Sequence, residues 1–523
     1  MSTYDEVPYT SYPYAKTHPD RLCTLARLFG MQPANVARCR VLEIGCASGG
    51  NLVPMAELLP ECEFVGLDGS ERQIAMARDL AAAADVGNVR FCHADILELD
   101  RSWGTFDYII CHGVYSWVPR EVQDKILASM RDLLAPQGVG YVSHNVYPGW
   151  HMRDAIRHMM RYHVRGIESS RERIVQSRAL IDFLVKHVPS EDGAYALLLR
   201  RELQILQNVS EDYLFHEHLE EVNEPLYFHE MVERLARHEL AYLGDAEVLT
   251  MQLQQYAPEA AKALDQIVSD LISMEQYMDF VRNRQFRATL VCHADVPLRR
   301  NLHGSYVEGL AATFAPGRER KPIDLSPGLA QHFVASNELK VTSDRAMTKA
   351  ALLLLRERWP QPVPFDDLCR DATALLQSAG IPTSPTDRVA LGFDLLECFF
   401  QGAGVFLRSW VPPLALHPGE KPCTTRVARV QATRGTHVTS VLHETQHLER
   451  GPLHILQVLD GTRSHDEIVE ALADFVEAGR LELSHDGRPL TAREEMRGPL
   501  QTVLRDVLPQ FARRGLLVGA QRS

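Results

Sequence analysis

Long apolar runs, closely spaced cysteines and an excess of basic residues are all missing from this sequence of 523 residues. No apolar run approaches the length that spans a bilayer, and the start MSTYDEVPYT lacks the positive charge and apolar core of a signal peptide. The ten cysteines are scattered, without a C-x-x-C pair or the dense pattern of a disulfide-rich domain. We therefore expect a cytoplasmic protein that is neither exported nor inserted into a membrane.

The balance of charge also narrows the choice of partners. A formal net charge of -13 disfavours a long contact with a nucleic-acid backbone, because such contacts depend on clustered Lys and Arg. The length exceeds what one hydrophobic core usually serves, and a hydrophobic content of 45% is enough to bury several cores. We expect about two to four domains and no nucleic-acid partner.

Residues 40 to 145 alternate short apolar runs with helical stretches, which is the pattern of a parallel sheet with crossover helices. Helices are expected near 50–59, 70–84 and 120–134. The runs are predicted to be strands buried on both faces, namely Arg40–Cys46, Glu63–Asp68, Val89–Asp95, Phe106–Gly113 and Gly138–Asn145.

Two more strands of the same sheet are predicted after helical insertions. Leu240–Val248 follows an amphipathic helix, and Phe286–His293 alternates polar and apolar residues like an edge strand. The fold class expected is thus α/β, with a Rossmann-like sheet of seven strands.

The remaining chain contains a weak internal repeat, in which helices stop at glycine before the short runs Gly404–Leu407 and Gly515–Val518. Ser464 and Glu467 form a capping box at the start of a helix in the second copy. The predicted domains are a core with an N-terminal lid (1–155), a helical insertion (156–225), a region that completes the sheet (226–296), a linker (297–345) and two winged-helix-like modules (346–416 and 417–523).

The strongest motif is the stretch Glu43–Asn51, between the first strand and its helix. Glycines at 45, 49 and 50 let the backbone approach a ligand, and the helix N-terminus offers free N–H groups to a carboxylate. The spacing, with Ala47 among the glycines, differs from the dinucleotide pattern G-x-G-x-x-G. Glu43, two residues before the first glycine, is placed to hold an amino group.

Acidic residues also follow the second and third strands. Asp68 precedes Gly69 and Ser70, where a carboxylate accepts both hydroxyls of a ribose, and Asp95 precedes Ile96, where adenine would bind. Any one of these acids alone is more often a helix cap. Three of them at successive strand ends predict a nucleoside site, because ligands of open α/β sheets bind at those ends.

With these motifs the sequence resembles the class I S-adenosylmethionine (SAM)-dependent methyltransferases, in particular the subgroup that carries a methyltransferase regulatory domain. That subgroup includes rickettsial protein-lysine methyltransferases that act on outer-membrane protein. The resemblance covers the first 300 residues well and the rest loosely. The stretches that carry the closer match are Pro8–Leu22, His112–Val118, Asn145–His151, Glu217–Glu230 and Met278–His293.

The resemblance implies SAM as the cofactor and gives residues 226–296 a regulatory role. Tyr9, Tyr12, Tyr14 and His18 would fold as a lid over the cofactor, the alternative being that they pack a capping helix. The residues expected to bind the cofactor are Tyr12, His18, Glu43, Gly45, Ala47, Gly49, Asn51, Asp68, Gly69, Ser70, Gln73, Asp95, Ile96, His112 and Gly113.

Two aromatic-rich loops follow the fourth and fifth strands. Methyl transfer needs a nucleophile held in line with the methyl group and shielded from water, and aromatic walls provide both. The catalytic residues expected on this ground are Tyr115, Trp117, His144, Asn145 and Tyr147. Each of these is also open to a packing role, and His112 and His144 to a structural one.

The stretch His443–His447 matches H-E-x-x-H, the pattern of zinc proteases. That pattern needs a helix to place both histidines on one face, whereas the β-branched surroundings and Gly451 favour a strand or turn. We expect no metal site.

The function expected is methylation of a lysine amine on a protein, and only the resemblance supplies the lysine. The alternatives are a methyltransferase for small molecules or peptide natural products, and a SAM-sensing protein without turnover. The mixed charges of the last long helix favour a polypeptide or a partner subunit for the C-terminal modules. A homodimer remains open.

Overall fold

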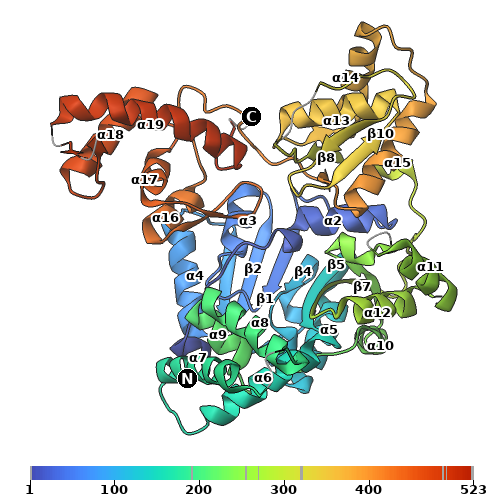
Figure 1. The fold of residues 1–523 in the computed structure, drawn as a ribbon, viewed down its shortest axis with the longest axis vertical. Helices are drawn as coiled ribbons and strands as arrows, with labels where there is room; N and C mark the ends of the chain where they lie inside the picture. The colour runs from blue at the N-terminus through green and yellow to red at the C-terminus, as the bar shows by residue number, and fades with distance from the viewer. Residues whose placement is uncertain are drawn as a thin grey trace.

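The structure is a computed structural model, and the residues it describes are 3–189, 192–253, 256–268, 270–318, 322–485, 488–490 and 492–519. Figure 1 shows a central sheet with a group of helices below it and two further modules above it. Among the described residues, no helix has both the length and the apolar character needed to cross a membrane. All ten cysteines lie in this part of the chain and are free thiols.

The central sheet has seven strands in the order β3-β2-β1-β4-β5-β7-β6, which confirms the expected fold class. Strands β1 to β5 are parallel, and β7 runs antiparallel to both of its neighbours. The strands are β1 (Arg40–Ile44), β2 (Glu63–Asp68), β3 (Val89–His93), β4 (Phe106–Cys111), β5 (Leu134–Asn145), β6 (Leu240–Asp245) and β7 (Phe286–His293).

Both faces of the sheet are covered because its strands are apolar on both sides. Val41 of β1 packs into the core shared with one set of helices, and its neighbour Leu42 into the core shared with the other. The first set is α2 (Pro19–Leu28), α3 (Leu52–Leu58) and α4 (Glu71–Ala83), and the second is α5 (Arg120–Leu133) and α10 (Phe228–Arg237).

The expectation that Phe286–His293 is an edge strand is wrong. β7 lies between β5 and β6, and β6 forms the edge. Its polar residues Arg287 and Thr289 indicate a solvent-facing side in the sequence pattern, but both are fully buried. The alternation of side chains therefore reflects a buried charge network and not a solvent-facing side.

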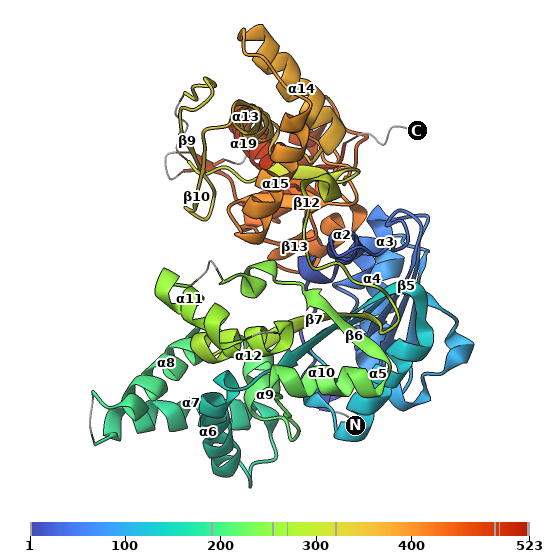
Figure 2. The ribbon, with the colours of Figure 1, turned by 90° about the vertical axis from the view of Figure 1, so that its right-hand side faces the viewer.

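The insertion between β5 and β6 is a helical group with a core of its own, containing Ile156, Ile181, Leu199 and Phe215. Figure 2 shows these helices gathered at one side below the sheet. They are α6 (Gly149–His163), α7 (Ser170–His187), α8 (Ala194–Asn208) and α9 (Glu211–His218), and between β6 and β7 come α11 (Pro258–Ile267) and α12 (Leu271–Arg282).

The structure differs from expectation at residues 297–345, which were predicted to be a linker. They contain β8 (Ala311–Phe314), which is fully buried and lies between two later strands in a three-stranded sheet. Its short run of small apolar residues is hidden among Gly, Pro and Arg, so composition alone missed it. The first module therefore begins well before residue 346. Its other elements are β9 (Gln331–Val334), β10 (Lys340–Ser343), α13 (Ala346–Arg358), β11 (Val363–Pro364), α14 (Phe365–Ser378), α15 (Thr386–Phe400) and β12 (Val405–Arg408).

The C-terminal module, residues 417–519, has a separate core that includes Leu456, Leu472 and Leu504. The capping box of Ser464 and Glu467 is confirmed at the start of α18. In Figure 1 the module lies above α3 and α4. Its elements are α16 (Arg426–Arg434), β13 (His437–Thr439), β14 (Thr445–His447), α17 (Arg450–Val458), α18 (His465–Glu477), β15 (Ser484–His485), β16 (Arg488–Pro489) and α19 (Arg493–Arg513).

Arg287 joins β7 to α12 through a fully buried ion network. Its guanidinium contacts Glu275 and Asp279 at 2.8 Å each, and lies 3.7 Å from the ring centre of Phe228. Both carboxylates are within 2% of full side-chain burial, so each depends on this cation for compensation.

We predict that Arg287→Ala lowers the free energy of unfolding by about 3 to 5 kcal/mol, because it removes the nearest cation from two buried carboxylates and leaves them only the hydroxyl of Tyr242 and the more distant Arg284 among the described residues. Urea unfolding followed by circular dichroism measures this change. Arg237→Ala is the control, since the exposed pair of Arg237 with Glu233 should contribute no more than about 0.5 kcal/mol. Equal stability of the two variants would contradict the prediction.

Candidate functional site

The turn after β1 is a tight backbone cradle. Gly45 and Gly49 both have φ of +75°, and a Cβ on Gly45 would lie 2.3 Å from Val114. A Cβ on Gly50 would lie 2.4 Å from the carbonyl oxygen of Ser11. Ala47 adopts a left-handed φ of 46°, and its N–H donates to Asp68 at 2.9 Å. The turn therefore brings bare backbone to the carboxyl edge of the sheet.

Glu43, the fourth residue of β1, is a buried carboxylate that is only half satisfied. Its Oε1 accepts a hydrogen bond of 2.6 Å from the side chain of Asn51, whereas Oε2 has no partner among the described residues. Burial raises the pKa of Glu43 to about 8, with Asp68 adding to the rise. An amino group at this position would satisfy Oε2 and favour the carboxylate form.

Asp68 ends β2 beside the same turn. One of its oxygens accepts from the N–H of Ala47 and the other from the N–H of Ser70, both at 2.9 Å. Burial raises the pKa of this carboxyl group. A Cβ on the neighbouring Gly69 would meet nothing within 4 Å, so there is open space beside Asp68. The remaining lone pairs of the carboxylate are suited to hydroxyl donors.

Asp95 follows β3 and caps the short helix η2 (Ile96–Glu98), accepting from the N–H of Leu97 at 2.9 Å. Asp95 is exposed and Ile96 half-buried. Because β3, β2 and β1 are neighbours in the sheet, Asp95, Asp68 and Glu43 follow one another along its carboxyl edge. The order needed for adenine, ribose and amino acid is therefore present.

The end of β4 brings His112 and Gly113 to the same edge. The ring of His112 packs 4.0 Å from that of Tyr14, and its Nδ1 lies 3.1 Å from the hydroxyl of Tyr141. Burial lowers the pKa of His112 to about 4, so the ring is neutral at pH 7. Gly113, with φ of +70°, donates its N–H to Ser143 and leaves open space where a side chain would stand.

The N-terminal segment crosses this edge, as the expected lid would, but its residues divide between two surroundings. Ser70 caps α4 and donates to Asp5, and Gln73 donates to the carbonyl of Tyr9, so both hold the segment in place. Tyr12 packs against His437, and His18 against Trp410 and His443. Tyr12 and His18 therefore face the modules that follow the sheet.

The expectation of two aromatic walls differs from the structure at Tyr115 and His144. Tyr115 lies in the core beneath α5, where its hydroxyl is 3.4 Å from Arg234, and it is fully buried. His144 is also buried and contacts Thr289, and burial lowers its pKa to about 3. His144 points into the protein because both faces of the sheet are covered, and Tyr115, in the short helix η4 (Tyr115–Trp117), turns into the core beneath α5.

Trp117, Asn145 and Tyr147 lie near the end of β5. Trp117 is half-buried and packs edge-on against Trp150 at 5.8 Å, and Asn145 donates to the side chain of Asn223 at 2.9 Å. Tyr147 is half-buried and stacks on His151 with ring centres 3.9 Å apart. These side chains form the wall of the edge next to Gly113.

Three residues that no sequence pattern predicts complete this wall, namely Asp154, Asn223 and Tyr227. Asp154 accepts long hydrogen bonds from Tyr147 at 3.3 Å and Asn223 at 3.4 Å. The ring of Tyr227 lies 5.4 Å from that of Tyr147. The hydroxyl of Tyr227 is 3.1 Å from His151. A bridge between Val146 and Leu226 brings the two segments together, and nothing local in the sequence signals that pairing.

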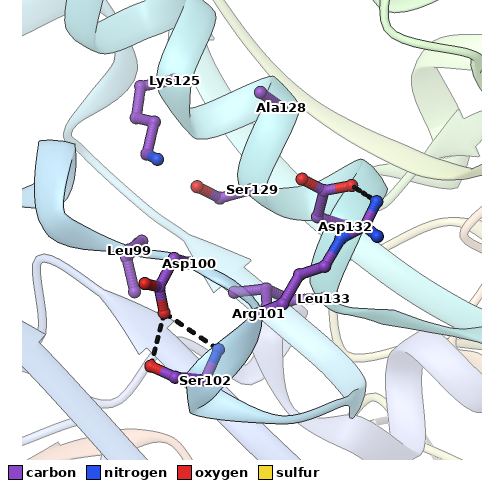
Figure 3. A pocket seen from close by; sticks show the side chains of 9 residues that line it. All are labelled: Leu99, Asp100, Arg101, Ser102, Lys125, Ala128, Ser129, Asp132 and Leu133. Carbon is purple, nitrogen blue, oxygen red and sulfur yellow. Dashed lines mark hydrogen bonds and ion pairs between the residues drawn. The ribbon is translucent and has the colours of Figure 1, made fainter.

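Two cavities lie outside the acidic edge. Figure 3 shows one of about 350 Å³, lined by Asp100, Arg101, Lys125 and Asp132 among others. These residues precede β4 and β5, so this cavity lies at the opposite edge of the sheet from the site. The other, of about 300 Å³, lies between the N-terminal segment, α4 and the C-terminal module, and Ser48 and Gly50 of the turn after β1 also line it.

The H-E-x-x-H stretch forms a turn and the strand β14, as expected, and not a helix. His443 is buried, whereas His447 is exposed and packs on His437. Among the residues that the structure describes, no group of three or more His, Cys, Asp or Glu is placed to hold a metal ion.

Three stretches of the chain match models of known families. Residues 41–138 match a methyltransferase domain, and residues 210–293 match a predicted methyltransferase regulatory domain. Residues 420–516 match the C-terminal winged helix domain of PKMT.

Similar proteins extend the match to the whole chain. An uncharacterized protein of Rickettsia prowazekii is 36% identical over 523 residues, covering 98% of this chain and 93% of the relative. A second one is 40% identical over 232 residues, covering 44% of this chain and 93% of the relative. The structure of PKMT2 from Rickettsia typhi, in complex with AdoHcy, has a TM-score of 0.85 and 32% identity, covering 98% of this chain and all of the other.

We predict that Ala47→Gly raises the free energy of unfolding by about 0.5 to 1 kcal/mol, because glycine adopts the left-handed φ at this position without strain. Urea unfolding at an unchanged slope measures the effect. The matched substitution Gly45→Ala should destabilise the protein, since its Cβ overlaps Val114. A loss of stability in Ala47→Gly would contradict the strain at this turn.

Proposed function

Because the chain belongs to the family of SAM-dependent methyltransferases that carry a regulatory domain and a PKMT-type winged-helix domain, we propose that it methylates lysine side chains of a protein. PKMT stands for protein lysine methyltransferase, and the similarity to PKMT2 over the whole chain supports a protein acceptor. The observation on this chain that carries the proposal is the wall formed by Tyr147, Tyr227 and Asp154.

The residues at the carboxyl edge fit SAM. The orphaned Oε2 of Glu43 suits the amino group of its methionine part, Asp68 the ribose hydroxyls and Asp95 the adenine. The turn at Gly45 and Gly49 would let the methionine part of SAM approach the backbone closely, because no side chain stands there. SAM supplies a methyl group on a sulfonium, which a nucleophile displaces in line.

The wall at Tyr147 suits a lysine acceptor for two reasons. The faces of Tyr147 and Tyr227 attract an ammonium group. The carboxylate of Asp154 accepts two long hydrogen bonds from described residues and can accept another from that group. The hydroxyl of Tyr147 stays protonated at pH 7, since burial raises its pKa to about 12.

Lysine must lose a proton before its nitrogen can attack. This costs about 4 to 5 kcal/mol at pH 7, because the pKa of a lysine side chain in water is about 10.4. Half-buried rings lower the cost because they remove water from around the ammonium group. Asn145 and Asn223 hold each other at 2.9 Å and so fix the position of the wall beside Gly113.

We predict that SAM affinity rises with pH between about 6 and 8, by up to about tenfold per unit. The free enzyme holds a proton on Glu43 at neutral pH, because its pKa is raised to about 8, and the ammonium of SAM expels that proton. Calorimetry at pH 7 in two buffers of different ionisation enthalpy measures the proton released. Glu43→Gln should abolish both the release and the slope, and retention of either would remove Glu43 from this role.

The lysine proposal is tested by incubating the enzyme with labelled SAM and a cell lysate. Label is expected on protein bands, and acid hydrolysis should yield methylated lysine. Label in the small-molecule fraction, or on carboxylates or hydroxyls, would reject lysine as the acceptor. The same assay with Asp154→Asn should show kcat/KM for the protein lowered about 10- to 100-fold, the usual effect of losing one charge-assisted contact.

The control for Asp154→Asn is Asp182→Asn, which removes a carboxylate from an exposed i,i+4 pair with Lys186 on α7. It should leave methylation unchanged. Affinity for AdoHcy should be the same in both variants, because neither carboxylate lies among the cofactor residues. If Asp154→Asn methylates as fast as Asp182→Asn, the acceptor does not bind at this wall.

A further inference from the structure

His443 reaches from the C-terminal module into the cofactor edge. Its Nε2 lies 2.8 Å from Oδ1 of Asn51, although 392 residues separate the two in the chain. Both side chains are 2% exposed. The ring packs edge-on to that of His18 at 5.3 Å, and burial lowers the pKa of His443 well below its usual value. His443 is therefore neutral at physiological pH and has one N–H to donate.

The side-chain amide of Asn51 has one orientation that satisfies its neighbours. Oδ1 accepts from the backbone N–H of Tyr14 at 2.9 Å, and a backbone N–H is always a donor. His443 must therefore donate through Nε2. Nδ2 of Asn51 then faces Oε1 of Glu43 at 2.6 Å and Oγ1 of Thr17 at 3.0 Å. His443 thus contacts the residue that holds one oxygen of Glu43.

The backbone conformation at His443 also supports this contact with Asn51. The residue has φ of 61°, a left-handed conformation that is uncommon for residues other than glycine. The turn is closed by hydrogen bonds between Ser440 and Glu444, and Val441 and Leu442 pack against Leu58 at the end of α3. Strain of this kind persists where the surroundings hold it, and here it directs the ring toward Asn51.

We propose that His443 is a positioning residue of the cofactor site: by donating to Asn51 it keeps that amide turned toward Glu43, and so the C-terminal module contributes to SAM affinity. The inference rests on the role proposed for Glu43 but not on lysine as the acceptor. Its residues come from three parts of the chain, the module, the N-terminal segment and the turn after β1.

Other contacts hold the C-terminal module against α3 and α4 and do not involve Asn51. The carboxylate of Glu57 on α3 accepts from the backbone N–H groups of Arg426 and Val427, at the start of α16, at 2.6 and 3.0 Å. Arg434 pairs with Asp79 of α4 at 2.8 Å. Docking of the module and orientation of Asn51 therefore have separate structural causes and are separable by substitution.

The experiment measures AdoHcy affinity by calorimetry on full-length variants. His443→Phe keeps a ring but loses the donor, and we expect affinity to fall about 3- to 15-fold, the effect of one lost hydrogen bond. His443→Gln keeps an N–H donor and should stay within about twofold of the natural protein. Equal losses in Phe and Gln variants, or none in either, would overturn the proposal.

His447→Phe is the matched control, because His447 lies on the same hairpin, is exposed and does not contact Asn51. It should leave affinity unchanged. Glu57→Gln weakens the docking of the C-terminal module on α3 and leaves His443 in place. If His447→Phe weakened AdoHcy binding as much as His443→Phe, the effect would come from the hairpin as a whole and the proposal would fail.

A double-mutant cycle distinguishes action through Glu43 from a general loss of packing. In the Glu43→Gln background, His443→Phe should have little further effect, since the carboxylate it helps to orient is gone. Additive losses would overturn the proposal. If Glu43→Gln alone left affinity and its pH slope unchanged, the cofactor role of Glu43 would fail instead, which is a different result.

The pH dependence gives a readout that a packing role would not move. Without its donor from Asn51, Glu43 should titrate at higher pH, and the rise of AdoHcy affinity should shift upward with it. Four titratable groups face Glu43, namely Asp68, Tyr14, Cys46 and Cys111. Among the described residues, none of these four groups contacts His443. An unshifted profile in His443→Phe would contradict the proposed route.

A measurement on the natural protein covers the case in which His443→Phe does not fold. Coupling between two sites is reciprocal, so AdoHcy must also stabilise the hairpin that carries His443. Hydrogen exchange of residues 436–447 should slow on addition of AdoHcy, while that of α18 should not change. Equal exchange of the hairpin with and without AdoHcy would overturn the proposal.

Discussion

A carboxylate buried at the end of the first strand is the constraint around which the site is arranged. Glu43 is 3% exposed, and its charge would be costly there without compensation. Asn51 satisfies one oxygen and leaves the other for a ligand. Because Asn51 is also bonded to Tyr14 and His443, the N-terminal segment and the C-terminal module meet at the same amide. The cofactor edge is thus assembled from distant parts of the chain.

The parts of this site that the sequence predicts are those with local signals. Strands β1, β2, β4 and β5 contain runs of buried apolar residues, and the turn at Gly45 and Gly49 needs positive φ that glycine supplies. The acids Asp68 and Asp95 follow from the same pattern, because each stands at a strand end. Topology then brings them together without any further information.

The parts that sequence analysis missed depend on long-range pairing. The alternation in Phe286–His293 indicates an edge strand, yet Arg287 is fully buried and pairs with carboxylates of α12. Tyr115 belongs to an aromatic loop but turns into the core beneath α5. Asp154 and Asn223 come together only because two segments bridge at Val146 and Leu226. Because these partners are far apart in the sequence, composition and spacing cannot predict their contacts.

His443 belongs to a stretch that is not a zinc site, yet the residue still has a proposed role in the protein. The surroundings of H-E-x-x-H ruled out a zinc helix correctly, but the left-handed backbone at His443 has no local signal. If His443 positions Asn51 as proposed, AdoHcy binding and docking of the C-terminal module favour each other. The acceptor wall, in contrast, takes Asn223 and Tyr227 from the region that matches a regulatory domain. Under the two proposals, the two appended regions would act on opposite halves of the reaction, one on the methyl donor and one on the acceptor.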